Sequence, residues 1–209
     1  METLDYIAQK FQIDITQRPP IEILKINRTI MAQTLCELGF NVGAEIGVAK
    51  GEHSVLLCQN IPNLKLYCID AWEHYPGYWD YLTTRLNFFY EETQKVLAPY
   101  NCVIIKKFSQ DAVKDFADGS LDFVYIDAAH DFRHVVDDID DWSKKVKRGG
   151  IIYGHDYKRS TNPKLRQEVV DAVNGYTYAN KIHPWFLLGE RGPYDRLYRE
   201  GTRSWMWVR

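Results

Sequence analysis

The side chains of this chain best suited to chemistry stand at the ends of short apolar runs. Asp70 ends the run at 65–70, Asp127 ends the run at 121–127, and His155 and Asp156 follow the run at 151–153. Such runs are typical of buried parallel strands, whose carboxyl ends meet at one edge of a sheet and form a ligand site there. Carboxylates and imidazoles can accept protons or hold a divalent metal. The sequence therefore predicts one site that combines ligand binding with acid–base or metal chemistry.

A glycine turn early in the chain indicates which ligand is bound. Segment 42–51 reads as a short strand and a turn with Gly47 and Gly51, followed by a helix through 54–57. Glycine permits positive φ and close approach to the main chain, and the helix N-terminus offers unpaired N–H groups. Asp70, at the end of the next strand, would accept hydrogen bonds from ribose hydroxyls. This pattern predicts a nucleoside pocket; the alternative is a tight turn followed by a surface aspartate.

The spacing of the glycines favours a cofactor without phosphate. A dinucleotide site is typically G-x-G-x-x-G, which places a helix N-terminus against a pyrophosphate. Here Gly43, Gly47 and Gly51 are four residues apart, and Glu45 lies between the first two. A carboxylate would repel a pyrophosphate but would attract a cationic amino-acid moiety.

The pattern Glu45-x-Gly47-x-x-x-Gly51, followed by a strand ending in Asp70, resembles the S-adenosylmethionine site of class I methyltransferases. The resemblance extends from about residue 43 to the C-terminus. Ser109-Gln110-Asp111 is similar to the S-Q-D of catechol O-methyltransferases, which implies that Ser109 and Gln110 meet the adenine. Ser109 could also cap the helix that begins there. The resemblance implies a cofactor site made of these residues: Glu45, Gly47, Gly51, Asp70, Trp72, Ser109, Gln110 and Asp127.

The segment Asp127-Ala128-Ala129-His130 resembles the catalytic motif of catechol and caffeoyl-coenzyme-A O-methyltransferases. In those enzymes the aspartate binds a divalent metal, and a lysine three residues later takes the proton from the acceptor hydroxyl. His130 stands at that offset here, as in some sugar-modifying antibiotic methyltransferases. The resemblance therefore implies Asp127 and His130 as catalytic residues, with His130 as the general base.

His155-Asp156 stands where metal-dependent relatives have two oxygen ligands. The resemblance implies a metal site of Asp127, His155 and Asp156, in which Asp156 matches the family and His155 departs from it. An imidazole with two carboxylates suits Mn, Fe or Zn at least as well as Mg. His155 either ligates the metal or has a supporting or packing role, and the need for a metal stays open.

Alternating apolar periodicities predict the elements that position these residues. Amphipathic patterns predict a helix at 2–11, a second at 21–38, others at 81–97, 131–146 and 162–173 with Gly175 as a stop, and a helix opening at 109. Strands are predicted at 65–70, 103–106, 121–127, 151–153, 185–188 and 204–208, besides the one beginning at Val42. On helix 131–146 the apolar stripe includes Phe132, and the run Asp137, Asp138, Asp140 and Asp141 is predicted to be solvated. The aromatic segment 72–79 is either a lid or acceptor wall, or a satellite core.

This order of elements predicts an α/β protein: a Rossmann-like, doubly wound sheet with helices on both faces. The methyltransferase resemblance implies seven strands, mostly parallel with one antiparallel strand. One domain is expected over 1–209, with helices in 1–40 covering the cofactor cleft and the Rossmann-like core in 41–209. The 209 residues are 45% hydrophobic, which is enough for one substantial core.

Composition and charge restrict the partners. The formal net charge is −2, which gives no reason to expect binding to nucleic acid or anionic membranes. No apolar run is long enough to span a membrane, and the four cysteines are scattered, so a cytoplasmic protein with buried free thiols is expected. The oligomeric state stays open between a monomer and a homodimer.

These features together predict S-adenosylmethionine-dependent O-methylation of a small-molecule phenol, catechol or sugar, with a divalent metal (Mg or Mn) as an optional cofactor. Two alternatives remain: a non-catalytic subunit that binds S-adenosylmethionine, and a metal-dependent hydrolase that uses the His/Asp cluster. The absence of an H-E-x-x-H pattern disfavours the hydrolase.

Overall fold

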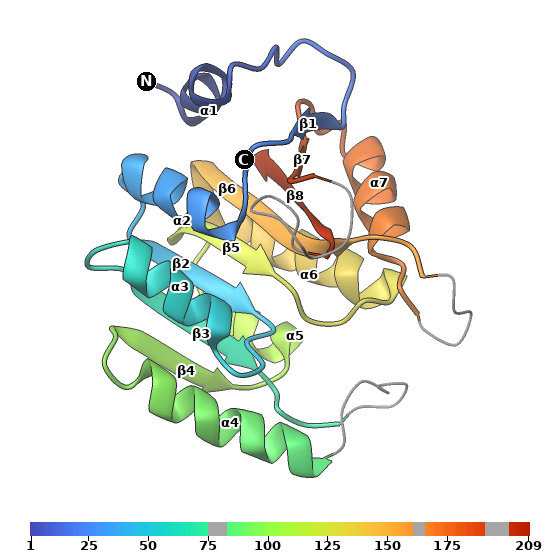
Figure 1. Cartoon of the computed structure of the whole chain (residues 1–209). Helices are drawn as coiled ribbons and strands as arrows, with labels where there is room; N and C mark the ends of the chain where they lie inside the picture. Colours follow the sequence, from blue (N-terminus) through green and yellow to red (C-terminus); the bar gives the residue numbers. More distant parts are fainter. Residues whose placement is uncertain (75–82, 161–165, 191–200) are drawn as a thin grey trace.

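The computed structural model describes residues 1–74, 83–160, 166–190 and 201–209, and in these parts of the chain it contains one eight-stranded sheet (Figure 1). The strand order is β1-β7-β8-β6-β5-β2-β3-β4. The strands are β1 (Ile21–Ile23), β2 (Val42–Ile46), β3 (Lys65–Asp70), β4 (Cys102–Lys106), β5 (Leu121–Ile126), β6 (Val146–Tyr157), β7 (Phe186–Leu188) and β8 (Arg203–Val208). Among these, only β8 is antiparallel to its neighbours, since it pairs antiparallel with both β6 and β7. The prediction of a mostly parallel sheet with one antiparallel strand is confirmed.

The eighth strand, β1, corrects both the strand number and the helix predicted at 21–38. Ile21 and Ile23 are buried on either side of exposed Glu22, and the three residues pair in parallel with β7. The helix, α2 (Arg28–Glu37), begins only after its capping residue Asn27, whose side chain accepts the backbone N–H of Ile30. Leu24, directly after β1, is 48% exposed and so does not pack on an apolar helix face. Pairing at the free edge of the sheet therefore prevails over the helical periodicity here.

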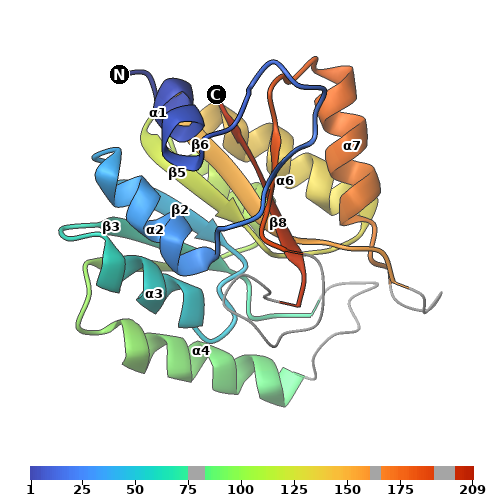
Figure 2. The ribbon, with the colours of Figure 1, turned by 45° about the horizontal axis from the view of Figure 1, so that its top comes forward.

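The helices form a layer on each face of the sheet (Figure 1, Figure 2). One layer holds α1 (Thr3–Phe11), α2, α3 (Glu52–Asn60) and α4 (Thr83–Leu97). The other layer holds the short α5 (Ser109–Ala112), the 3-10 turn η1 (Val113–Asp115), α6 (Phe132–Lys145) and α7 (Val169–Ala179). Each layer has its own buried apolar cluster, and the strands between them contribute side chains alternately to both. The doubly wound arrangement places the carboxyl ends of β2, β3, β4 and β5 at one edge.

Helix α6 differs from its prediction on both of its faces. Asp131 caps it by accepting the N–H of His134, and the apolar residues Val135, Ile139 and Trp142 are buried. Phe132, at the start of that stripe, is instead 46% exposed. Asp138 was predicted to be solvated and is only 3% exposed, because α5 packs over this side of α6.

Helix α7 begins later and ends later than predicted. It runs from Val169 through Gly175 to Ala179, and Lys181, with a φ of 53°, is where the chain turns away. Gly175 does not stop the helix because its backbone stays out of the positive-φ region. Asn162 and Pro163, the predicted start, lie outside the described residues, as do most of the aromatic segment 72–79 and of the loop at 189–203.

The cysteines are free, as predicted, but only one of them is fully buried. Cys68 is buried, and the other three are partly exposed. Cys58 Sγ and Cys102 Sγ lie 3.5 Å apart. No described helix is long and apolar enough to cross a membrane.

Candidate active site

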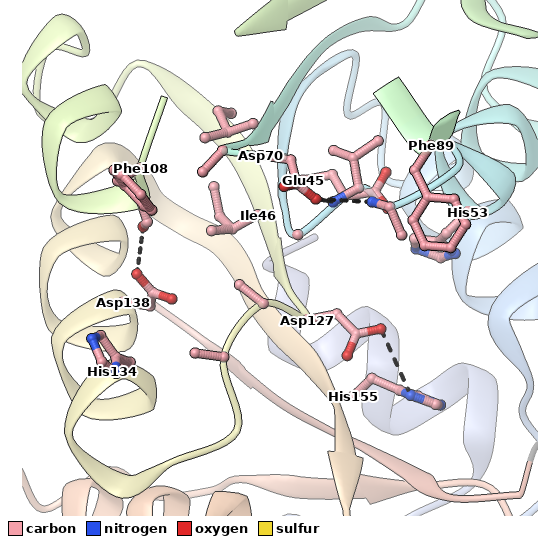
Figure 3. Close-up of a pocket in the computed structure, with 18 of the residues that line it drawn as sticks. Glu45, Ile46, His53, Asp70, Phe89, Phe108, Asp127, His134, Asp138 and His155 are labelled. Carbon is pink, nitrogen blue, oxygen red and sulfur yellow. Dashed lines mark hydrogen bonds and ion pairs between the residues drawn. The ribbon is translucent and has the colours of Figure 1, made fainter. Parts of the chain in front are cut away.

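The carboxyl ends of the central strands open into a cavity of about 720 Å³ (Figure 3). Most of the site residues predicted from the sequence line it: Glu45, Gly47, Asp70, Ser109, Gln110, Asp127, His130, His155 and Asp156. Gly51 and Trp72 do not line it and instead support the turn behind it. Gly51, with a φ of 81°, precedes the first residue of α3. Trp72 is 2% exposed, and its Nε1 donates to the carbonyl oxygen of Ala49 at 2.8 Å.

Gly47 is needed at the turn because of the protein's own backbone. Its φ is 90°, and a Cβ there would lie 2.2 Å from the carbonyl oxygen of Asp127. The close approach of the β5–α6 connection, and not only of a ligand, therefore excludes a side chain. A substitution at Gly47 would disturb folding as well as binding.

Asp70 holds the same turn with its carboxylate. Its Oδ2 accepts the N–H groups of Val48 and Ala49, both at 3.0 Å, and its Oδ1 accepts that of Trp72 at 2.8 Å. Burial raises the pKa of Asp70, although these backbone hydrogen bonds oppose the rise. Oδ2 already accepts two N–H groups, but Oδ1 accepts one and keeps a second lone-pair position, so Asp70 can shape the turn and still accept a hydroxyl of a bound ligand.

Glu45 lies at the floor of the cavity and is 1% exposed. Ser54 Oγ donates to its Oε2 at 2.5 Å. Burial raises the pKa of Glu45 to about 8, opposed by the Ser54 hydrogen bond and aided by Asp127. The carboxyl is therefore mostly protonated at neutral pH and can ionise when a cation binds beside it.

We predict that Glu45→Gln makes the protein's stability less dependent on pH. The ordinary pKa of Glu45 is 4.5, and the folded value is about 8. Between these values the folded state binds the extra proton, so the free energy of unfolding falls as pH rises through this window. Glutamine lacks that proton but can still accept from Ser54.

Melting temperatures measured from pH 5 to pH 8 provide the test. The wild type should lose more stability over this range than the variant. The pKa of Asp138 is also raised, but Asp138 is present in both proteins. The difference between the two pH profiles of stability therefore reports on Glu45 alone. Parallel curves for the two proteins would contradict the assignment of a protonated Glu45.

Ser109 does not cap the helix that begins with it, because the capping position is Phe108. Its Oγ donates to Asp138 Oδ1 and accepts from Trp142 Nε1 at 2.7 Å. Burial raises the pKa of Asp138 to about 7, opposed by the hydrogen bond from Ser109. Asp138 lies three residues after Val135 and four before Trp142, and this helical spacing is the sequence signal that could have identified it as an inward residue.

The predicted base and two of the predicted metal ligands form one compact group. The ligand atoms of Asp127, His130 and Asp156 all lie within 4.8 Å of one another. His130 Nε2 is 3.1 Å from Asp156 Oδ2 and 3.6 Å from Asp127 Oδ1. His155 lies beside this group, with Nδ1 3.3 Å from Asp156 Oδ1 and 3.8 Å from Asp127 Oδ2. Burial alone would raise the pKa of Asp156, but the adjacent His155 and His130 hold it well below its usual range.

His53 is a residue of the cavity wall that the sequence analysis missed. It is 7% exposed, its ring centroid lies 4.1 Å from that of Tyr125, and its Nδ1 has no hydrogen-bond partner in the described parts of the chain. Burial, with a smaller effect of Arg28, lowers the pKa of His53 to about 3, so its ring is neutral. Its place two residues after Gly51 is the signal that could have identified it.

Several solved structures to which this chain is similar are O-methyltransferases. The chain is similar to the O-methyltransferase from Bacillus cereus in complex with SAH, with a TM-score of 0.62 and 14% identity over 99% of this chain and 90% of that one. It is similar to a putative caffeoyl-CoA O-methyltransferase from Staphylococcus aureus, with a TM-score of 0.60 and 15% identity over 97% and 89% of the two chains. It is also similar to the O-methyltransferase TomG from Streptomyces achromogenes in complex with SAM, with a TM-score of 0.59 and 15% identity over 100% and 90%.

The fold and the pocket at its strand ends are those of a class I methyltransferase. Residues 44–157 match the family model described as a methyltransferase domain, so the chain belongs to that family. No curated protein matches it by sequence.

Proposed function

We propose that this methyltransferase uses S-adenosylmethionine to methylate a hydroxyl oxygen of a small molecule, such as a phenol, a catechol or a sugar. The observation that carries the proposal is the group of Asp127, His130 and Asp156 in the wall of a cavity of about 720 Å³. The O-methyltransferase names of the similar structures, two of them holding SAH or SAM, support it.

The cavity residues divide into those that hold the cofactor and those that activate the acceptor. The sulfonium of the cofactor supplies an activated methyl group. Asp70 would orient the ribose, and Glu45 would face the cationic amino-acid end. With the cofactor fixed in this way, the protein needs to align an acceptor oxygen and make it nucleophilic, and alignment alone can contribute several kcal/mol.

His130 can remove the acceptor's proton. The carboxylates of Asp156 and Asp127 lie 3.1 and 3.6 Å from its Nε2, so they would stabilise the imidazolium that forms. Tyr125, whose hydroxyl donates to Asp127 Oδ2 at 3.3 Å, helps to fix that carboxylate. The proposal therefore assigns His130 and Asp127 the catalytic roles predicted from the sequence.

The same group fits a divalent metal. Two carboxylates and one imidazole within 4.8 Å are a donor set for Mn, Fe or Zn at least as well as for Mg. Asp127 and Asp156 would hold the ion, joined by His155 as predicted or by His130, and a bound metal would lower the pKa of the acceptor hydroxyl. One nitrogen cannot ligate a metal and accept a proton, so His130 Nε2 has one of the two roles.

We predict that a chelator lowers methyl transfer and that Mg²⁺ or Mn²⁺ restores it. Asp127→Asn should weaken Mn²⁺ binding, which can be followed by the spin-resonance signal of the free ion independently of activity. Asp131→Asn is the control, since Asp131 caps α6, pairs with His134 and is not a member of the group. Full transfer in the chelator, together with unchanged activity of Asp127→Asn, would rule the metal out.

Transfer of a labelled methyl group from S-adenosylmethionine to a panel of phenols, catechols and sugars tests the proposed function. O-methylated product should form with at least one class of hydroxyl. Binding of the cofactor without transfer to any acceptor would favour the non-catalytic subunit.

The N-terminal segment is proposed to cover one side of the cofactor cleft. Arg28, the first residue of α2, lines the cavity from that segment. A small-molecule acceptor, no nucleic-acid or membrane partner, and a cytoplasmic location belong to this proposal.

A further inference from the structure

Asp138 is a buried acid in the cavity wall for which the proposed chemistry has no use. It is 3% exposed, and no basic side chain forms an ion pair with it in the described parts of the chain. His134 lowers its pKa slightly, while Asp137 and Asp141 raise it. A buried carboxyl without a cation is costly, and such groups are found preferentially at functional sites.

The hydrogen bonds around Asp138 leave one of its carboxyl oxygens available to a ligand. An indole N–H can only donate, so Trp142 Nε1 occupies an acceptor position of Ser109 Oγ. The single hydroxyl proton of Ser109 is therefore free to point at Asp138 Oδ1, which accepts it. No hydrogen bond to Oδ2 is present among the described residues, so Oδ2 is the oxygen that can carry the proton toward the cavity when the acid is protonated. Asp138 thus presents an O–H donor at the cavity wall.

The position of Asp138 in the cavity matches the base of a bound nucleoside. In Figure 3, Phe108 and Asp138 lie at one side of the cavity, His53 and Phe89 lie at the other, and Asp70 lies between them. A ribose held at Asp70, with the amino-acid end toward Glu45 and His53, directs its base toward Phe108 and Asp138. Ser109 Oγ is already engaged by both Asp138 and Trp142.

We propose that Asp138 is the residue that reads the purine base, by donating its Oδ2–H to N1 of adenine, the ring acceptor on the edge away from the sugar. This assignment rests on the proposed use of S-adenosylmethionine. It makes Asp138 a specificity-determining residue of the cofactor site, in place of Ser109.

Analogues of S-adenosylhomocysteine test the hydrogen bond without any variant. In the 1-deaza analogue a C–H replaces N1, and in the 7-deaza analogue a C–H replaces the acceptor on the other ring. Calorimetry should show the 1-deaza analogue binding about 10-fold more weakly than S-adenosylhomocysteine, because the buried donor of Asp138 is left unpaired. The 7-deaza analogue should bind within about 3-fold of it.

Two variants distinguish the donor from mere packing. Asp138→Asn keeps an oxygen for Ser109 and an N–H for N1, so it should retain the discrimination against the 1-deaza analogue. Asp138→Leu should bind S-adenosylhomocysteine about 10-fold more weakly and should no longer discriminate. Melting curves would confirm that both variants fold.

Equal affinity of the wild type for S-adenosylhomocysteine and its 1-deaza analogue would overturn the inference, and so would discrimination that survives in Asp138→Leu. Failure of the wild type to bind S-adenosylhomocysteine at all would instead overturn the proposed function, and the inference with it.

Discussion

His130→Ala is expected to lower kcat by about 10²-fold or more while leaving the affinity for S-adenosylhomocysteine nearly unchanged, since general-base contributions are typically of that size. The imidazole lies 3.1 Å from Asp156 and 3.6 Å from Asp127, at the carboxylate group and not at the nucleoside turn. Single-turnover rates and calorimetry on the same preparation measure the two effects separately.

His134→Ala is the matched control for this substitution. His134 lies four residues later, in the first turn of α6, and also lines the cavity, but its Nδ1 pairs with Asp131 at 2.6 Å. Its removal should leave kcat within a few-fold of the wild type. The wild-type rate should also fall at acid pH as the base becomes protonated, and this limb should vanish in His130→Ala. An acid limb that persists in the variant would defeat the base assignment.

Asp70→Ala is expected to abolish cofactor binding or to weaken it greatly. The substitution removes the acceptor for the N–H groups of Val48, Ala49 and Trp72, so the turn loses its anchor and the ribose loses its partner. Equilibrium dialysis with labelled S-adenosylmethionine would measure the loss.

Asp122→Ala separates this effect from a general loss of stability. Asp122 Oδ2 accepts two consecutive backbone N–H groups, those of Asn41 and Val42, at 2.8 and 2.9 Å. These contacts lie at the amino ends of β5 and β2, on the opposite edge of the sheet from the cavity. The variant should be less stable but should bind the cofactor normally. Equal losses of affinity in the two variants would mean that Asp70 acts only through folding.

The sequence predicts the central strands well because two independent signals agree there. Four apolar or aromatic residues stand directly before Asp70 and four before Asp127, and each acid lies at the ligand edge of the sheet. Where signals conflict, the prediction fails. Ile21 and Ile23 alternate over only three residues directly before a helical pattern, and their pairing with distant β7 is what makes them a strand. Such a pairing involves residues more than 160 positions apart and leaves no local signal.

The candidate site is less predictable, because it depends on burial and on backbone geometry. Asp138 stands within a run of acids, so composition suggests solvent, although its helical spacing points inward. The carboxylate of Asp156 lies 3.1 Å from His130 Nε2, and the backbone of Asp156 has a φ of 55°. The strand pattern before Asp156 does not suggest this left-handed conformation. The order of the strands brings Asp127 and Asp156 to one edge of the sheet. The contact between Asp156 and His130 depends in addition on the left-handed backbone at Asp156.

Calorimetric titration of S-adenosylhomocysteine into the purified protein, with NAD titrated for comparison, tests the central claim most directly. The account predicts saturable binding of one S-adenosylhomocysteine per chain, lost in Asp70→Ala, and no binding of NAD. An absence of S-adenosylhomocysteine binding, or binding of NAD that is equally tight or tighter, would contradict it.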